Sequence, residues 1–130
     1  MIAVDTNILV RFLTQDDPEQ FPKSMRILKS PQIFIPDTVI LETEWVLRYA
    51  YKYKPEQIIT AFRSLFGLPN VYLRDAAAVA LAIEWRESGL DFADAFHLAQ
   101  SQHCRHMVSF DQRFSKRSRQ IGACPVILPA

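Results

Sequence analysis

Several common building blocks of enzyme sites are missing from these 130 residues. There is no CxxC or HExxH motif, no glycine-rich phosphate loop and no GxSxG element, so the usual zinc, nucleotide-binding and serine-hydrolase sites lack their parts. Only two cysteines are present, Cys104 and Cys124, and their spacing fits neither a zinc site nor a redox pair. We expect reduced thiols, with a single disulfide as the alternative.

Long hydrophobic runs are also lacking, because no apolar stretch approaches the roughly 20 residues that span a bilayer. Asp5 interrupts the apolar start of the chain and no small-residue cleavage site follows, so residues 1–13 do not resemble a signal peptide. Repeats, low-complexity tracts and linkers are absent as well. We therefore expect one cytoplasmic domain, residues 1–130, without a membrane segment.

Neither sign of charge dominates, since the formal net charge is +1 and the 22% charged content is that of an ordinary globular protein. The distribution is uneven, with 10 basic and 13 acidic side chains in residues 1–104 and 5 basic and 1 acidic in residues 105–130. The basic side chains near the C-terminus predict either a solvated face or a patch that contacts phosphates. They are Arg113, Lys116, Arg117 and Arg119.

Strand and helix signals alternate along the chain. Strands are expected at residues 1–4, 32–35, 71–73, 106–109 and 126–128. Helices are expected at residues 7–13, 17–30, 38–51, 55–66, 76–88, 91–103 and 110–117. This alternation predicts an α/β domain with a mostly parallel sheet, in which functional sites form beyond the carboxyl ends of the strands.

Four acidic residues end an expected strand or border the apolar stripe of an expected helix: Asp5, Glu42, Asp94 and Asp111. A carboxylate near the core is costly unless it is paired or holds a cation. Each also has a structural explanation, as a helix cap, a partner of the helix dipole or a helix-surface residue. Together they favour a shared site for Mg²⁺ or Mn²⁺, which prefer oxygen ligands, activate water and neutralise a phosphodiester.

Further polar residues are expected to support this site. Thr6 and Asn7 follow Asp5 closely enough to form hydrogen bonds there. Ser109 can donate a hydrogen bond that orients a neighbouring carboxylate. Asp91 is expected to cap a helix rather than to bind a metal.

The helix that carries the second acid also carries aromatic residues. Glu44 is expected to point into solvent, and Trp45 to lie in the core or in an interface. Tyr49, Tyr51 and Tyr53 end this helix and cannot all point inward. An aromatic surface for protein contact is therefore expected.

The segments around the four acids resemble, in order, the motifs of PIN-domain nucleases. The segments are Ile2–Leu9, Val39–Leu47, Asp91–Ala99 and Val108–Asp111. Within that family, this compact chain is similar to VapC toxins of toxin–antitoxin pairs. The resemblance implies a Rossmann-like α/β/α sandwich around a central parallel sheet. It also implies a metal-dependent endoribonuclease, often a homodimer, that is inhibited by a VapB antitoxin.

The four acids carry over from the motifs as the catalytic and metal-binding residues, and Ser109 stands where the family often has Thr or Ser. A non-toxin PIN nuclease in RNA processing and a catalytically silent RNA-binding or interaction domain on the same fold are the alternatives. A phosphatase with Asp5 as nucleophile is a third. It needs a second carboxylate two residues later, where this chain has Asn7.

Overall fold

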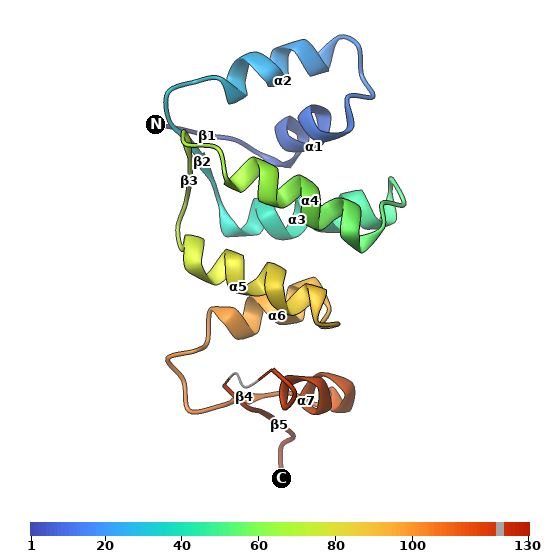
Figure 1. The fold of residues 1–130 in the computed structure, drawn as a ribbon, viewed down its shortest axis with the longest axis vertical. Coiled ribbons are helices and arrows are strands. Elements are labelled where there is room, and N and C mark those ends of the chain that lie inside the picture. The colour runs from blue at the N-terminus through green and yellow to red at the C-terminus, as the bar shows by residue number, and fades with distance from the viewer. Residues whose placement is uncertain (122–123) are drawn as a thin grey trace. The chain divides into compact units, whose positions relative to one another are not determined.

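The fold alternates helices with short parallel strands, as the sequence predicts for an α/β chain (Figure 1). The structure is a computed structural model that describes residues 1–121 and 124–130. It forms two compact units, residues 1–74 and residues 75–130. In the described part of the chain, all strand pairs are parallel.

The first unit is built on a sheet with the strand order β1-β2-β3. Its elements are β1 (Ile2–Ala3), α1 (Thr6–Thr14), α2 (Gln20–Leu28), β2 (Ile33–Ile35), α3 (Asp37–Tyr49), α4 (Pro55–Phe66) and β3 (Val71–Leu73). Ile33 of β2 pairs with Ile2 on one side and Val71 on the other. The helices cover this sheet with apolar side chains that are fully buried, among them Leu9, Ile40 and Leu47, and Ile35 of β2 is fully buried as well.

The second unit pairs two helices and a small sheet. Its elements are α5 (Ala76–Glu87), α6 (Phe92–Ala99), β4 (Met107–Val108), α7 (Gln112–Ser118) and β5 (Val126–Ile127). Helices α5 and α6 pack against each other, and Met107 of β4 pairs with Val126 of β5. The buried side chains of this unit include Val79, Ala82, Phe96, Leu98 and Phe114.

Local signals explain where several helices begin and end. Pro55 is the first residue of α4, where its missing N–H costs nothing. Asp75 caps α5 by accepting a hydrogen bond from the Ala78 N–H at 3.0 Å. Gly89 follows α5 with φ +109°, a conformation that side-chain-bearing residues rarely adopt. The turn after α5 therefore depends on this glycine.

Helices α2 and α6 are the most shortened relative to their predicted ranges, 17–30 and 91–103. Helix α2 begins at Gln20 and not near Asp17. The Asp17 carboxylate accepts hydrogen bonds from the N–H groups of Glu19 and Gln20, both at 2.9 Å. These bonds stabilise a turn that precedes the helix. Helix α6 ends at Ala99 and not near residue 103.

Other predictions concern the surface and the cysteines. Cys104 is exposed, Cys124 is buried, and both are free thiols, so the disulfide alternative is wrong. No helix in the described ranges is long and apolar enough to cross a membrane.

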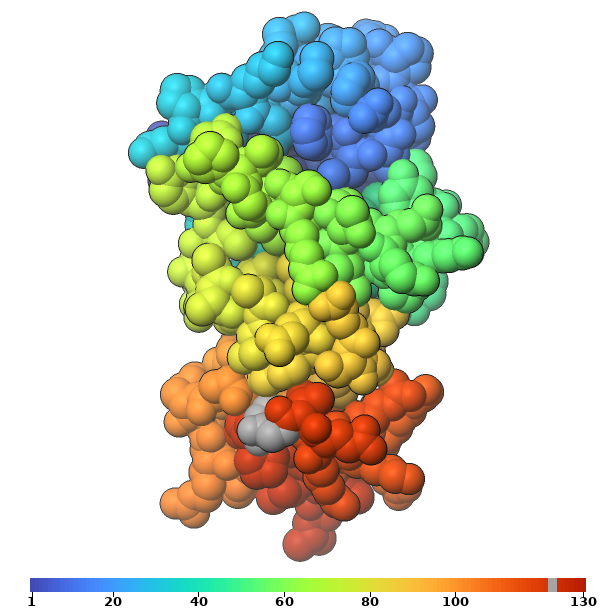
Figure 2. Space-filling view, viewed as in Figure 1, coloured from blue at the N-terminus to red at the C-terminus, as the bar shows by residue number. Residues whose placement is uncertain are grey.

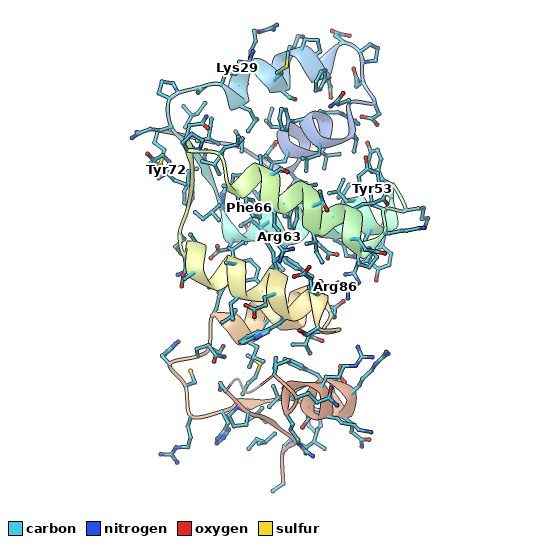
Figure 3. All side chains as sticks on the ribbon, in the orientation of Figure 1. Lys29, Tyr53, Arg63, Phe66, Tyr72 and Arg86 are labelled. Atoms are coloured by element: carbon cyan, nitrogen blue, oxygen red, sulfur yellow. The ribbon has the colours of Figure 1, made fainter. Side chains whose placement is uncertain are left out.

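The segment that joins α3 to α4 projects from the side of the first unit (Figure 2). Tyr53 lies in this segment (Figure 3).

Candidate functional site

Thr6 connects the two predicted acids of the first unit. Asp5 is the N-cap of α1 and accepts a hydrogen bond from the Ile8 N–H at 3.2 Å. The neighbouring Thr6 is buried, and its hydroxyl donates a hydrogen bond to the Glu42 carboxylate on α3. This bond ties Glu42 to the start of α1. Asp5 itself is exposed, so the expectation that its charge lies close to the core is wrong.

A cavity of about 470 Å³ lies beside Asp5, between α1 and α2. Asn7, which was predicted to support the site, shares this cavity with Asp5. Arg11 and Lys23 also line it and were not predicted. Arg11 lies on α1, the helix that Asp5 caps, whereas only the packing of α2 on α1 brings Lys23 to the acid.

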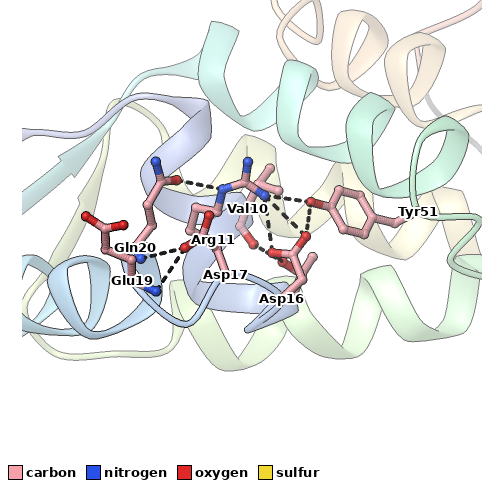
Figure 4. Close-up of polar contacts among 8 residues, drawn as sticks. Val10, Arg11, Asp16, Asp17, Glu19, Gln20 and Tyr51 are labelled. Carbon is pink, nitrogen blue, oxygen red and sulfur yellow. Dashed lines mark hydrogen bonds and ion pairs between the residues drawn. The ribbon is translucent and has the colours of Figure 1, made fainter.

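Arg11 organises a polar network next to this cavity (Figure 4). Its guanidinium donates to both carboxylate oxygens of Asp16 at 3.2 Å, to the Tyr51 hydroxyl oxygen at 2.9 Å and to Gln20 at 2.8 Å. The Tyr51 hydroxyl donates to Asp16 at 2.6 Å. This bond, aided by one from Thr14, lowers the pKa of Asp16 to about 2. The network links α1 and its following turn to the end of α3.

Helix α3 corrects the prediction for Glu44 and narrows the one for Trp45. Glu44 is buried with only 4% exposure, because Arg48 one turn later pairs with it at 3.0 Å and compensates the charge. Trp45 is 57% exposed and does not belong to the core. Its ring lies 5.2 Å from the ring of Tyr49, which is also exposed, and Arg48 lies 4.8 Å from that ring. This face of α3 therefore presents aromatic side chains.

Asp94 is the half-buried acid of the second unit. Burial raises the pKa of Asp94 above its ordinary value, and the negative charges of Asp91 and Asp111 raise it further, while His97 opposes them. Asp91 caps α6 by accepting a hydrogen bond from the Ala93 N–H at 3.2 Å, which confirms its predicted role as a cap. Three carboxylates thus influence one another here.

Ser109 and Asp111 are linked differently from the prediction. The Ser109 hydroxyl was expected to donate to a carboxylate, but its oxygen accepts a hydrogen bond from the Asp111 backbone N–H at 3.0 Å. The Asp111 carboxylate in turn accepts from the Phe114 N–H at 3.0 Å and caps α7. Ser109 therefore positions Asp111 through its backbone.

A second cavity, of about 380 Å³, brings acidic and basic residues together in this unit. Its lining includes Asp91, Asp94 and Asp111 and, from the predicted basic patch, Arg113 and Arg117. The other members of that patch are exposed outside this lining: Lys116 and Arg119.

Arg86, from the last turn of α5 (Figure 3), also lines this cavity and was missed by sequence reasoning. The sequence offers no reason to select Arg86, because the helix dipole already explains a basic residue in the last turn of a helix. Arg86 also lies 25 positions (111 − 86) from Asp111 in the chain.

The donor chemistry of the four predicted acids fits a divalent cation, because Mg²⁺ and Mn²⁺ prefer oxygen ligands. Asp5 and Glu42 belong to the first unit, and Asp94 and Asp111 to the second. Among the residues that the structure describes, no group of three or more His, Cys, Asp or Glu side chains is gathered closely enough to hold a metal ion. The convergence of the two pairs on one metal site therefore stays a prediction.

Comparison with known proteins places these residues in a family. A family model described as the PIN domain matches residues 2–120, a span that includes all four acids. The chain is 28% identical over 125 residues to a VapC ribonuclease of Aquifex aeolicus (strain VF5), covering 89% of this chain and 91% of that one. A crystal structure of Mycobacterium tuberculosis VapC20, a toxin that cleaves the sarcin-ricin loop, is similar with a TM-score of 0.46 and 20% identity, covering 95% of this chain and 96% of that one. From the match over residues 2–120, the chain belongs to the PIN-domain family.

Proposed function

We propose that this protein is a metal-dependent endoribonuclease that acts in the cytoplasm as the toxin of a toxin–antitoxin pair. The family match over residues 2–120 carries this proposal, because it spans all four predicted acids. The similarity to a VapC ribonuclease along 89% of the chain supports the finer assignment to a toxin. A phosphodiester of RNA is then the bond that is cleaved.

The acids would hold Mg²⁺ or Mn²⁺: Asp5, Glu42, Asp94 and Asp111. A divalent cation in such a site lowers the pKa of water and neutralises charge that develops on the phosphodiester. The protein's own contribution is to orient the carboxylates. Thr6 fixes Glu42 by a hydrogen bond, and Ser109 holds the backbone of Asp111.

Basic residues on and after α7 supply the charge that an RNA backbone requires. Arg113 and Arg117 share a cavity with Asp94, so they are placed to contact RNA next to the acids. Lys116 and Arg119 are exposed on the same segment and extend the basic surface. Such contacts position the RNA without reading its sequence.

The test compares two Asp→Asn variants that are matched in structure. Asp5 and Asp75 both cap a helix by accepting a hydrogen bond from the N–H three residues later, and Asn caps a helix as well as Asp does. Asp5→Asn is expected to abolish cleavage of RNA in the presence of Mn²⁺ and to leave the fold intact. Asp75→Asn is expected to cleave normally. Full cleavage by Asp5→Asn contradicts the proposed site.

Partners follow from the toxin assignment. We propose that the protein forms a homodimer and is neutralised by a VapB-like antitoxin. The exposed rings of Trp45 and Tyr49, with Arg48 against the second ring, support a protein-contact surface on α3, since aromatic residues and Arg are enriched in interfaces. An antitoxin segment that folds on binding can place an Arg or Lys among the carboxylates.

Expression tests the toxin assignment. The wild-type gene alone is expected to slow growth of its host, whereas Asp5→Asn is not. Co-expression with an adjacent small gene is expected to restore growth and to yield a stable complex. If the protein cleaves RNA but is a monomer, does not slow growth of its host and purifies without a partner, it is a PIN nuclease that is not a toxin.

A further inference from the structure

The cavity of the second unit is lined by charges of both signs. Three aspartates and three arginines line it. Among the described residues, Arg86, Arg113 and Arg117 form no ion pair with any carboxylate. A guanidinium that forms no ion pair needs an anionic ligand, an ion or water to compensate its charge. The arginines are therefore available to an anion.

Two of these arginines are held in place by backbone carbonyls. Arg86 donates a hydrogen bond from Nη1 to the Leu90 carbonyl at 3.2 Å. Arg117 donates from Nη1 to the carbonyl of Gly89, the residue with φ +109°. A guanidinium has five N–H donors, so one bond to a carbonyl fixes its position and leaves donors for a ligand. Arginine in this state is suited to a phosphate, which it binds with two parallel hydrogen bonds.

The remaining lining is apolar. Leu90 and Phe114 both line the cavity and are nearly fully buried, at 2% and 5% exposure. The volume of about 380 Å³ falls within the roughly 300–1,000 Å³ that is usual for small-molecule sites. Arginine side chains and an apolar surface in one cavity match the phosphate and the base of one nucleotide.

We propose that this cavity is a single-nucleotide subsite for RNA, in which Arg86, together with Arg113 and Arg117, binds a phosphate next to the one that is cleaved. The proposal rests on the ribonuclease function and adds to it a substrate contact outside the basic patch near the C-terminus. The base of that nucleotide lies against the apolar part of the lining. Arg86 binds RNA and takes no part in bond cleavage.

Binding of small ligands tests the subsite without relying on catalysis. The probes are adenosine 5′-monophosphate and adenosine, titrated in metal-free buffer. The wild-type protein is expected to bind the nucleotide more tightly than the nucleoside. Arg86→Gln is expected to lose this preference, with affinity for the nucleotide falling roughly tenfold or more, because hydrogen bonds between charged groups are lost. Arg86→Lys is expected to retain part of it.

A matched control separates this contact from net charge and from fold. Arg105→Gln removes the same charge from an exposed position of the same unit, outside the cavity. It is expected to bind both probes as the wild type does. If Arg86→Gln weakens nucleotide and nucleoside equally and also lowers the melting temperature, Arg86 is only a structural residue of the α5–α6 turn and the proposal is overturned.

Cleavage assays then distinguish the subsite from the proposed function. With a single-stranded RNA substrate, Arg86→Gln is expected to raise KM roughly tenfold and to change kcat little, because the lost contact is the same in substrate and transition state. If the protein cleaves RNA and Arg86→Gln has unchanged KM, the subsite is rejected and the nuclease stands. If nucleotide binding depends on Arg86 but RNA is never cleaved, the nuclease is rejected. If Arg86→Gln loses binding to the antitoxin but still binds RNA and the nucleotide normally, the cavity serves a protein partner and the proposal is overturned.

Discussion

Asp94 is half-buried in a cavity that it shares with two other carboxylates, and its pKa is raised first by burial and then by their negative charges. The folded chain therefore holds the Asp94 proton more tightly than the unfolded chain does. Ionisation of Asp94 lowers the free energy of unfolding. This cost is absent below the ordinary pKa of 3.8 and is complete once the pH exceeds the raised pKa of the folded state.

Asp94→Asn is accordingly expected to stabilise the metal-free protein at neutral pH, because it removes a charge that burial and its neighbours disfavour. The gain in melting temperature should shrink as the pH falls toward 3.8. Thermal denaturation in EDTA over a pH series measures this. Glu84→Gln, which removes an exposed charge on α5, is the control and should show little change. A gain that does not vary with pH would rule out this explanation.

Hydrogen bonds of Arg11, Asp16 and Tyr51 join α1 and its following turn to the end of α3. We call these three residues the junction. The pKa of Asp16 is lowered because of these bonds. A depressed carboxyl pKa adds stability above the unfolded value, here 3.8, and this stability is lost as the pH falls toward about 2. The junction should therefore weaken in acid.

Tyr51→Phe tests the junction, since it removes one hydroxyl and keeps the ring. The pKa of Asp16 is expected to rise, and the melting temperature to fall modestly above pH 3.8. The difference from wild type should narrow toward pH 2. Tyr53→Phe is a matched control, because no hydrogen bond of its hydroxyl to a described residue is present. If Tyr51→Phe and Tyr53→Phe change the melting temperature equally, the hydrogen bond from Tyr51 to Asp16 contributes nothing to stability.

Most elements were predictable because their signals are local. Pro55 fixes the start of α4, and the predicted range 55–66 is the observed one. Apolar runs located the strands to within one residue at each end. The start of α2 was misplaced because Asp17 supports a turn as readily as a helix cap. The burial of Glu44 was missed because it depends on its pairing with Arg48.

For the whole molecule, the candidate site was predictable to the extent that family motifs mark it. The four acids were named from the sequence because each lies in a recognisable segment, and the family match covers them all. Arg11, Lys23 and Arg86 were not named. They line the two cavities through tertiary packing, and their own neighbours in the chain carry no corresponding pattern.

Metal binding tests whether the two units contribute to one site. Asp5→Asn in the first unit and Asp94→Asn in the second should each lower Mn²⁺ affinity by roughly tenfold or more, since even the loss of an outer-shell partner costs 10–100-fold. Isothermal titration measures this, with Asp75→Asn as a control of normal affinity. If only variants of one unit weaken binding, the acids do not share a site.

The two tryptophans of the chain are divided between the units. Trp45 lies in the first unit and is 57% exposed, whereas Trp85 lies in the second and is 6% exposed. A water-exposed indole emits at longer wavelength than a buried one and is quenched by dissolved iodide. Each unit thus carries its own intrinsic fluorophore, so the unfolding of the two halves can be timed separately without any added label.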